Sequence, residues 1–216
     1  MKPFRSKDSD AMARTLEEIC EKHGTDKLSH GFCKHYAERF EPIRFNSITI
    51  CEIGTWEGSS VKAWLEYFDN PLTKVVGFDH RPEWMPEDGC PIVVEIGSQE
   101  DAEFQDGFGE RHGPFDIIVD DGGHKPLQHL ASLDALWPYL RPGGWYAIED
   151  MHSIFNICWN ESGEDRTIFD WLNERWKSIL VGGSDIQRVD VVGGDWDDGI
   201  IFLQKRSEPY TPEPKP

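Results

Sequence analysis

From residue 48 onward, short apolar runs alternate with longer amphipathic segments, and this alternation allows few folds. Apolar runs bounded by turn residues predict buried strands, and the segments between them predict helices. We expect strands over 48–53, 74–79, 92–96, 115–120, 145–148, 187–192 and 199–204, and helices over 8–23, 59–68, 101–111, 126–140 and 167–180. Strands that alternate with helices pair in parallel through right-handed crossovers. The predicted fold class is therefore α/β, a doubly wound sheet covered on both faces.

Two helices carry more detailed expectations. The first is expected to start at a cap on Asp8 or Ser9 and to end at Gly24. The helix over 126–140 is expected to bury one stripe that includes Leu127 and to stop before Pro142. The chain of 216 residues predicts one domain over 1–206, with 1–45 as a helical cover for the ligands and 207–216 as a disordered tail.

Composition narrows the possible partners. The formal net charge is −18, which disfavours binding to nucleic-acid phosphates. No apolar run reaches the roughly 18 residues that a membrane span needs. The five cysteines are widely spaced without a CxxC pair, which predicts reduced core thiols. We therefore expect a cytoplasmic protein that binds neither nucleic acid nor membrane, and a homo-oligomer is left open.

The first strand is followed by a glycine loop that opens a helix. Gly54 and Gly58 are present, but Trp56 stands where the middle glycine of a dinucleotide fingerprint would fall, so pyrophosphate binding is disfavoured. Asp79 ends the second strand, where a carboxylate can accept both ribose hydroxyls. On spacing alone, a tight turn with a solvated aspartate explains these residues equally well.

Acidic residues follow two further strands. Asp120 and Asp121 end the fourth strand, and Glu149 and Asp150 end the fifth. If these strands are neighbours, about 4.8 Å apart, the carboxylates crowd one edge of the sheet, so that either some are protonated or a cation lies among them. Oxygen ligands would select Mg²⁺. Helix capping is the alternative, and we favour the metal site. His124 lies on the same loop and is the candidate base, with His152 as the second candidate.

The segment 23–154 resembles the class I S-adenosylmethionine-dependent methyltransferases, and within them the magnesium-dependent O-methyltransferases that act on sugars of macrolide and related antibiotics. The residues that carry the resemblance are Gly24-Thr25-Asp26-Lys27, Glu52 with Gly54, Gly58 and Ser60, Gly77 with Asp79, Gly97-Ser98-Gln99-Glu100-Asp101, Gly113-Pro114-Phe115-Asp116, Asp120-Asp121 with His124, Leu140-Arg141-Pro142-Gly143-Gly144, and Ile148-Glu149-Asp150. The resemblance implies a Rossmann-like, mostly parallel sheet of seven strands with an antiparallel strand near the C-terminus.

The resemblance also implies roles for single residues. Glu52, Gly54 and Ser60 would line the methionine end of S-adenosylmethionine, Asp79 would hold its ribose, and Ser98, Gln99 and Asp120 would lie near its adenine. Asp121, Glu149 and Asp150 would hold Mg²⁺, and His124 would be the catalytic base. Two positions, Trp56 and Ser98, depart from the usual pattern of the family.

The expected activity is methylation of a hydroxyl on a small molecule, a sugar or polyketide of natural-product biosynthesis. The acceptor is expected against segments 27–36 and 151–165, where Trp159 is equally well explained by ordinary loop packing. Three alternatives stay open. They are a catechol or phenol O-methyltransferase, an NAD-dependent oxidoreductase, and a cofactor-binding protein without catalysis.

Overall fold

The computed structural model describes residues 13–155, 166–193 and 198–208. Their core is a sheet of seven strands in the order β3-β2-β1-β4-β5-β7-β6. The strands are β1 (Thr49–Ile53), β2 (Lys74–Asp79), β3 (Ile92–Ile96), β4 (Phe115–Asp120), β5 (Leu140–Ile148), β6 (Ile186–Gly193) and β7 (Gly199–Lys205). β1 to β5 pair in parallel, and β7 runs antiparallel to both β5 and β6. The expected α/β sheet, with its antiparallel strand near the C-terminus, is confirmed.

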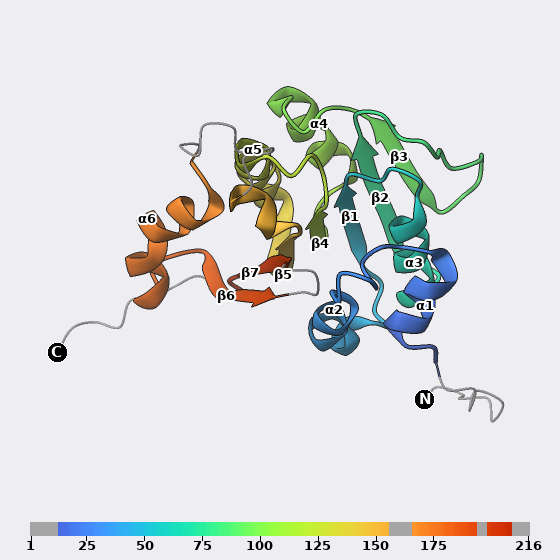
Figure 1. The fold of residues 1–216 in the computed structure, drawn as a ribbon, viewed down its shortest axis with the longest axis horizontal. Coiled ribbons are helices and arrows are strands. Elements are labelled where there is room, and N and C mark those ends of the chain that lie inside the picture. The colour runs from blue at the N-terminus through green and yellow to red at the C-terminus, as the bar shows by residue number, and fades with distance from the viewer. Residues whose placement is uncertain (1–12, 156–165, 194–197, 209–216) are drawn as a thin grey trace.

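Helices cover both faces of this sheet (Figure 1). One face packs against α1 (Leu16–His23), α2 (Cys33–Phe40) and α3 (Ser59–Tyr67). The other packs against α4 (Ala102–His112), α5 (Pro126–Leu136) and α6 (Ile168–Leu180). Short 3₁₀ helices occupy Glu41–Ile43, Trp137–Tyr139 and Met151–Phe155. Alternate residues of β1 serve the two cores, because successive side chains of a strand point to opposite faces.

The first helix starts later in the chain than the sequence predicts. α1 begins after Thr15, whose hydroxyl accepts the backbone N–H of Glu18 at 3.2 Å while the Glu18 carboxylate accepts the Thr15 N–H at 2.9 Å. This reciprocal capping box replaces the expected cap at Asp8 or Ser9, both of which lie outside the described residues. The expected end at Gly24 is confirmed, since Gly24 adopts the left-handed conformation with φ of 70°.

Two other elements were mispredicted. α2 is an additional helix, and tertiary contacts stabilise it, because the Tyr36 and Phe40 rings pack against Trp64 of α3 at centroid distances of 5.1 and 6.2 Å. α5 ends at Leu136, earlier than expected, and β5 starts at Leu140. Leu127 is 54% exposed and does not belong to the buried stripe, which starts at Pro126 and continues through His129 and Leu130. No described helix is both long and apolar enough to cross a membrane.

Candidate functional site

A cavity of about 780 Å³ opens beyond the carboxyl ends of β1, β2 and β4. Three strands end at the same level of the sheet, because β1 pairs with β4 up to Asp120, and Asp120 pairs with Ile148 of β5. The residues that follow these strand ends therefore lie around the cavity. The strand-end residues expected to form a site therefore converge there. The predicted residues that line the cavity are Gly54, Ser60, Asp79, Ser98, Gln99, Asp121, His124 and Asp150. Glu52, Asp120 and Glu149 are almost fully buried behind this lining.

The loop after β1 forms one wall, and glycine is required at its start. Gly54 has φ of +82°, and a Cβ there would lie 2.0 Å from the backbone oxygen of Asp121. β1 and the loop after β4 can approach this closely only because residue 54 has no side chain. Behind the wall, the Ser60 hydroxyl donates to Glu52 at 2.7 Å. The first turn of α3 is thereby attached to the end of β1.

Asp79 fixes the opposite side of the same loop. Its Oδ2 accepts the backbone N–H groups of Thr55 and Trp56 at 3.0 and 2.9 Å, and its Oδ1 accepts that of Arg81 at 2.7 Å. The carboxylate is therefore positioned by three backbone donors at the cavity wall. Because each carboxylate oxygen can accept more than one hydrogen bond, Asp79 retains acceptor capacity for a ligand hydroxyl.

Gln99 connects the cavity to a buried acid. Its Nε2 donates to Asp120 at 2.7 Å, and its Oε1 accepts the backbone N–H of Gly123 at 2.8 Å. The Tyr146 hydroxyl approaches the second oxygen of Asp120 at 3.4 Å. Burial raises the pKa of Asp120 to about 7. Asp120 thus supports the loop that carries Asp121 and His124, and its side chain lies beneath the cavity wall.

A buried lysine joins the acidic residues of the site. Lys27 is 1% exposed, and its Nζ lies 2.6 Å from Asp121 Oδ2, 2.9 Å from Glu149 Oε1 and 3.2 Å from Glu52 Oε1. The Tyr36 hydroxyl also donates to Glu149. Burial raises the pKa of Glu52 and Glu149, and the charge of Lys27 opposes that shift. One ammonium group therefore partly neutralises three carboxyl groups.

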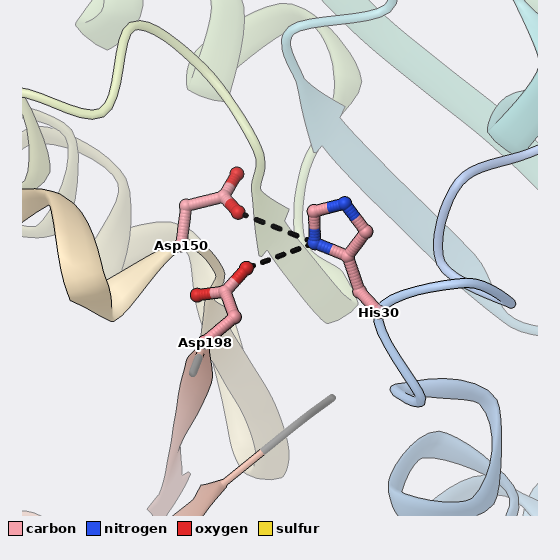
Figure 2. A group of neighbouring side chains, drawn as sticks. All are labelled: His30, Asp150 and Asp198. Atoms are coloured by element: carbon pink, nitrogen blue, oxygen red, sulfur yellow. Dashed lines mark hydrogen bonds and ion pairs between the residues drawn. The ribbon is translucent and has the colours of Figure 1, made fainter. Parts of the chain in front are cut away.

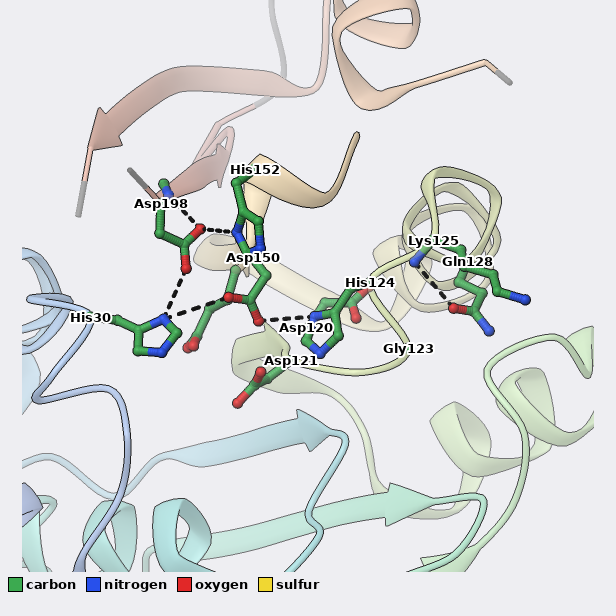
Figure 3. Close-up of polar contacts among 12 residues, drawn as sticks. His30, Asp120, Asp121, Gly123, His124, Lys125, Gln128, Asp150, His152 and Asp198 are labelled. Carbon is green, nitrogen blue, oxygen red and sulfur yellow. Dashed lines mark hydrogen bonds and ion pairs between the residues drawn. The ribbon is translucent and has the colours of Figure 1, made fainter. Parts of the chain in front are cut away.

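Asp121, His124 and Asp150 form a second group beside this lysine (Figure 3). One ligand atom from each lies within 4.8 Å of the others. His124 Nδ1 lies 2.9 Å from Asp150 Oδ2. Burial opposes a charged imidazole, but the carboxylates of Asp150, Asp121 and Asp120, Asp150 first, together outweigh it and raise the pKa of His124. The structure thus joins Asp121 and Asp150 with His124, whereas Glu149 faces Lys27 and Tyr36.

This group fits a divalent cation. The four acids Glu52, Asp121, Glu149 and Asp150 are buried or nearly so, and Lys27 supplies one positive charge to three of them. Buried carboxylates at this separation need further positive charge or protons. Carboxylate oxygens are the donors that Mg²⁺ prefers. Asp121 and Asp150 face the cavity, so an ion there would be accessible to a ligand in it.

Backbone strain marks the same place. Among the described residues, three that are not glycine have positive φ: Trp56 at 38°, His124 at 59° and Asp150 at 56°. All three line the cavity. Such conformations cost free energy in residues with a Cβ and concentrate at functional sites, where the surrounding structure holds side chains in required directions. The Trp56 position is therefore a strained, 58% exposed part of the cavity wall.

Sequence reasoning missed several residues of this region. Lys27 belongs to a segment that carries the family resemblance and to the segment 27–36 expected to face the acceptor, but its contact with the acids was not predicted. His30 and Tyr36 lie in the segment 27–36 that was expected to face the acceptor, but neither was given an individual role. Asp198 precedes β7 and was missed, because only tertiary structure brings it near the ends of β4 and β5. Trp159 and the remainder of segment 156–165 lie outside the described residues.

Comparisons with known proteins agree with the fold. Residues 51–151 match the family described as methyltransferase domain. The chain is 36% identical over 149 residues to mycinamicin VI 2''-O-methyltransferase of Micromonospora griseorubida, an alignment that covers 65% of this chain and 37% of that protein. It is 32% identical over 149 residues to demethylmacrocin O-methyltransferase of Streptomyces fradiae, with the same 65% and 37% coverage.

A solved structure is also similar. MycE methyltransferase from the mycinamycin biosynthetic pathway, in complex with Mg, SAH and mycinamycin VI, matches with a TM-score of 0.77 at 28% identity. The match covers 92% of this chain and 56% of that one. The chain therefore spans less than two thirds of the length of these relatives.

Proposed function

We propose that this chain, which has a methyltransferase domain and the class I methyltransferase fold, transfers a methyl group from S-adenosylmethionine to a hydroxyl of a small molecule with the help of Mg²⁺. The observation that carries the proposal is that the carboxylates of Asp121 and Asp150, which could hold a metal ion, line a cavity of about 780 Å³. A cofactor and a cation would then be held next to each other at the ends of β1, β4 and β5.

Residues of the cavity wall would bind the cofactor. Gly54 and Ser60, with Glu52 behind them, would surround its methionine end. Asp79, positioned by three backbone N–H groups, would accept the ribose hydroxyls. Ser98 and Gln99 would contact the adenine, and Asp120 would hold Gln99 in place.

The acids at the ends of β4 and β5 would bind the metal. Asp121 and Asp150 face the cavity, and Glu149 would join them if the metal replaces the charge of Lys27. When bound, Mg²⁺ stabilises negative charge that develops on an acceptor oxygen. His124 lines the same cavity and would accept the hydroxyl proton, while Asp150 orients its imidazole through Nδ1. Holding the acceptor oxygen in line with the methyl group supplies much of the remaining rate enhancement.

The acceptor class follows from the relatives. Relatives are named for O-methylation of mycinamicin VI, of demethylmacrocin and, in Streptomyces olivaceus, of a rhamnosylated tetracenomycin C, which supports a glycosylated polyketide as the acceptor for this chain. A small acceptor also agrees with the net charge of −18, which repels nucleic acid. We propose a cytoplasmic location, where S-adenosylmethionine is available.

The test combines binding with turnover. Calorimetric titration with S-adenosylhomocysteine and with NAD⁺ separates the methyltransferase from an oxidoreductase, and only S-adenosylhomocysteine is expected to bind. Methyl transfer from labelled S-adenosylmethionine is then screened against glycosylated macrolides, glycosylated tetracenomycins and catechols, with Mg²⁺ or with EDTA. We expect Mg²⁺-dependent methylation of a sugar hydroxyl. Methylation that continues at full rate in EDTA would contradict the metal role.

Asp121→Asn is the matching variant, because it keeps the side-chain shape and removes the charge. It is expected to abolish Mg²⁺-dependent turnover while S-adenosylhomocysteine still binds. Asp106→Asn is the control, since Asp106 accepts the Tyr139 hydroxyl at 2.7 Å on the exposed surface of α4. An Asp121→Asn variant that methylates normally would show that Asp121 does not hold the metal.

A further inference from the structure

A second cluster of histidine and carboxylate groups lies on the other side of Asp150. It consists of His30, from the loop after α1, Asp150, after β5, and Asp198, immediately before β7 (Figure 2). His30 and Asp198 do not line the cofactor cavity. The proposed methyl transfer therefore assigns no role to them, although three distant segments bring these groups together.

The separations among the three side chains match those of ligands around one ion. His30 Nδ1 lies 2.8 Å from Asp198 Oδ2 and 3.6 Å from Asp150 Oδ1. Two donors that each lie about 2.1 Å from one metal ion are roughly 3.0 Å apart in octahedral and 3.4 Å apart in tetrahedral geometry. The observed separations bracket these values, so an ion between the three groups requires little rearrangement.

Charge also favours a cation here. The side chains of Asp150 and Asp198 are 13% and 2% exposed, and one oxygen of each lies within 4.8 Å of the other. Two carboxylates this close repel each other when both are charged, and a cation between them reduces that repulsion. Among the described residues, the ion-pair partners of Asp198 are imidazoles alone, those of His30 and His152. A divalent ion would supply the charge that this pair lacks.

His152 would orient the metal ligand Asp198. Its Nδ1 lies 2.8 Å from Asp198 Oδ1, the oxygen that does not face His30 (Figure 3). The backbone N–H of Gly199 donates to the same oxygen at 2.6 Å. These contacts direct Oδ2 of Asp198 toward His30 and Asp150. Outer partners of this kind fix a ligand in its binding orientation.

Asp150 is shared between the two groups. Its Oδ2 lies 2.9 Å from His124, and its Oδ1 lies 3.6 Å from His30. A single carboxylate with one oxygen directed to each side is the usual bridge of a two-metal centre. The left-handed backbone of Asp150, with φ of 56°, presents the side chain to both groups.

We propose that His30, Asp150 and Asp198 bind a second divalent ion, a transition metal of the Mn²⁺ or Zn²⁺ type, next to the Mg²⁺ position and bridged to it by Asp150. One imidazole among carboxylates favours such ions, whereas an oxygen-only site favours Mg²⁺. Three protein ligands leave a coordination position open for water or a hydroxylated ligand. The site goes beyond the proposed function, which needs one Mg²⁺.

Mn²⁺ binding to the full chain tests the proposal, because Mn²⁺ can occupy both kinds of site. Free and bound Mn²⁺ are measured by electron paramagnetic resonance during a titration. We expect two bound ions for the wild type, with spin coupling between them. His30→Ala is expected to bind one. Asp121→Asn is expected to keep the ion at His30 and lose the other, so that His30→Ala combined with Asp121→Asn binds none.

Controls separate this site from a general loss of structure. His112→Ala removes a histidine that pairs with Glu95 at 2.6 Å away from both sites, and it should still bind two ions. His152→Ala should bind the second ion about 10- to 100-fold more weakly, because only the orientation of Asp198 is affected. His30 and His152 are partly exposed, and circular dichroism checks that both variants fold.

Two outcomes would overturn the proposal. In the first, the wild type binds a single Mn²⁺ that is lost in Asp121→Asn. The second cluster would then be only a hydrogen-bonded network, while the proposed methyltransferase activity would stand. In the second, His30→Ala binds two ions as tightly as the wild type. Failure of the proposed function itself would appear differently, as absence of S-adenosylhomocysteine binding or of methyl transfer.

Discussion

The ammonium group of Lys27 lies 2.6 Å from the Asp121 carboxylate at the end of β4, although 94 positions separate the two residues in the chain. The same ammonium contacts Glu149 and Glu52. Burial lowers the pKa of Lys27, but the three acids, Asp121 first, outweigh it and raise the pKa overall. Lys27 therefore stays charged and acts as an internal cation at the position where the metal is expected.

Replacing Lys27 by methionine is expected to make stability depend on divalent ions. Removing one partner of a buried ion pair costs about 3–5 kcal/mol, because the remaining charge is left uncompensated. Urea unfolding of Lys27→Met without divalent ions should show a loss of this size. Mg²⁺ in the millimolar range should restore part of it, since the ion supplies the missing charge.

Lys74→Met is the control for this experiment. Lys74 is exposed at the start of β2, so its removal should leave the unfolding free energy nearly unchanged, with or without Mg²⁺. If Lys27→Met unfolds at the same urea concentration as the wild type, Lys27 does not balance the buried acids. If it is destabilised but insensitive to Mg²⁺, the acids do not bind the ion in this variant.

Much of the fold could be predicted because local pattern and tertiary structure agree. β3 and β4 have the expected bounds, since each is a short apolar run between turn residues. α2 could not be predicted, because its stability depends on the Trp64 ring of α3, which the local sequence does not reveal. Leu127 was misassigned because it is apolar and next to the buried Pro126, whereas the buried stripe runs through Pro126, His129 and Leu130.

The sequence could predict those site residues that directly follow the parallel strands. Parallel neighbours end at one edge, so Asp121 and Asp150 were expected to meet, and both line the cavity. The partner of Glu149 was not predictable, because Lys27 and Tyr36 come from the N-terminal segment. His30 and Asp198 were missed in the same way. Their approach depends on how the first helices and β7 pack, which strand-end reasoning does not address.

Asp120 is expected to make stability depend on pH. Its pKa is about 7 in the folded state and, for an unperturbed aspartate, about 3.9 when unfolded. The folded state holds the proton more tightly, so the stabilisation is complete below the unfolded pKa and is lost as pH rises through about 7. Between pH 5 and 8 the loss from this group is on the order of 2 to 3 kcal/mol.

Asp120→Asn isolates this contribution. Asparagine keeps the shape and can still accept from Gln99, but it does not titrate. Urea unfolding at pH 5 and pH 8 should therefore show a smaller difference for Asp120→Asn than for the wild type. The exposed Asp106→Asn variant should keep the wild-type difference. Equal pH dependence in all three proteins would mean that Asp120 is not protonated in the folded state at pH 5.

His124 is expected to determine the acid limb of the pH–rate profile. A general base must be deprotonated, and the Asp150 carboxylate raises the pKa of His124 against the effect of burial. The rate of methyl transfer should therefore rise with pH through a value above about 6.5, the ordinary value for histidine. His124→Gln should lose this limb and roughly 10²- to 10⁴-fold in kcat, while S-adenosylhomocysteine still binds. A variant that keeps the limb would assign the base role to another residue, with His152 as the next candidate.

Gly54 and Gly89 offer a matched pair for testing the close approach of the loops after β1 and β4. Both have strongly positive φ, +82° and +85°, so alanine costs about 1–2 kcal/mol of backbone strain at either position. Only at Gly54 would the added Cβ lie 2.0 Å from the backbone of Asp121, whereas no atom lies within 4 Å of a Cβ at Gly89. Gly54→Ala should therefore lower the melting temperature more than Gly89→Ala does. It should also weaken S-adenosylhomocysteine and Mn²⁺ binding together, because the clash displaces the loop that carries Asp121 and His124. Equal behaviour of the two variants in calorimetry would show that this close approach does not shape the site.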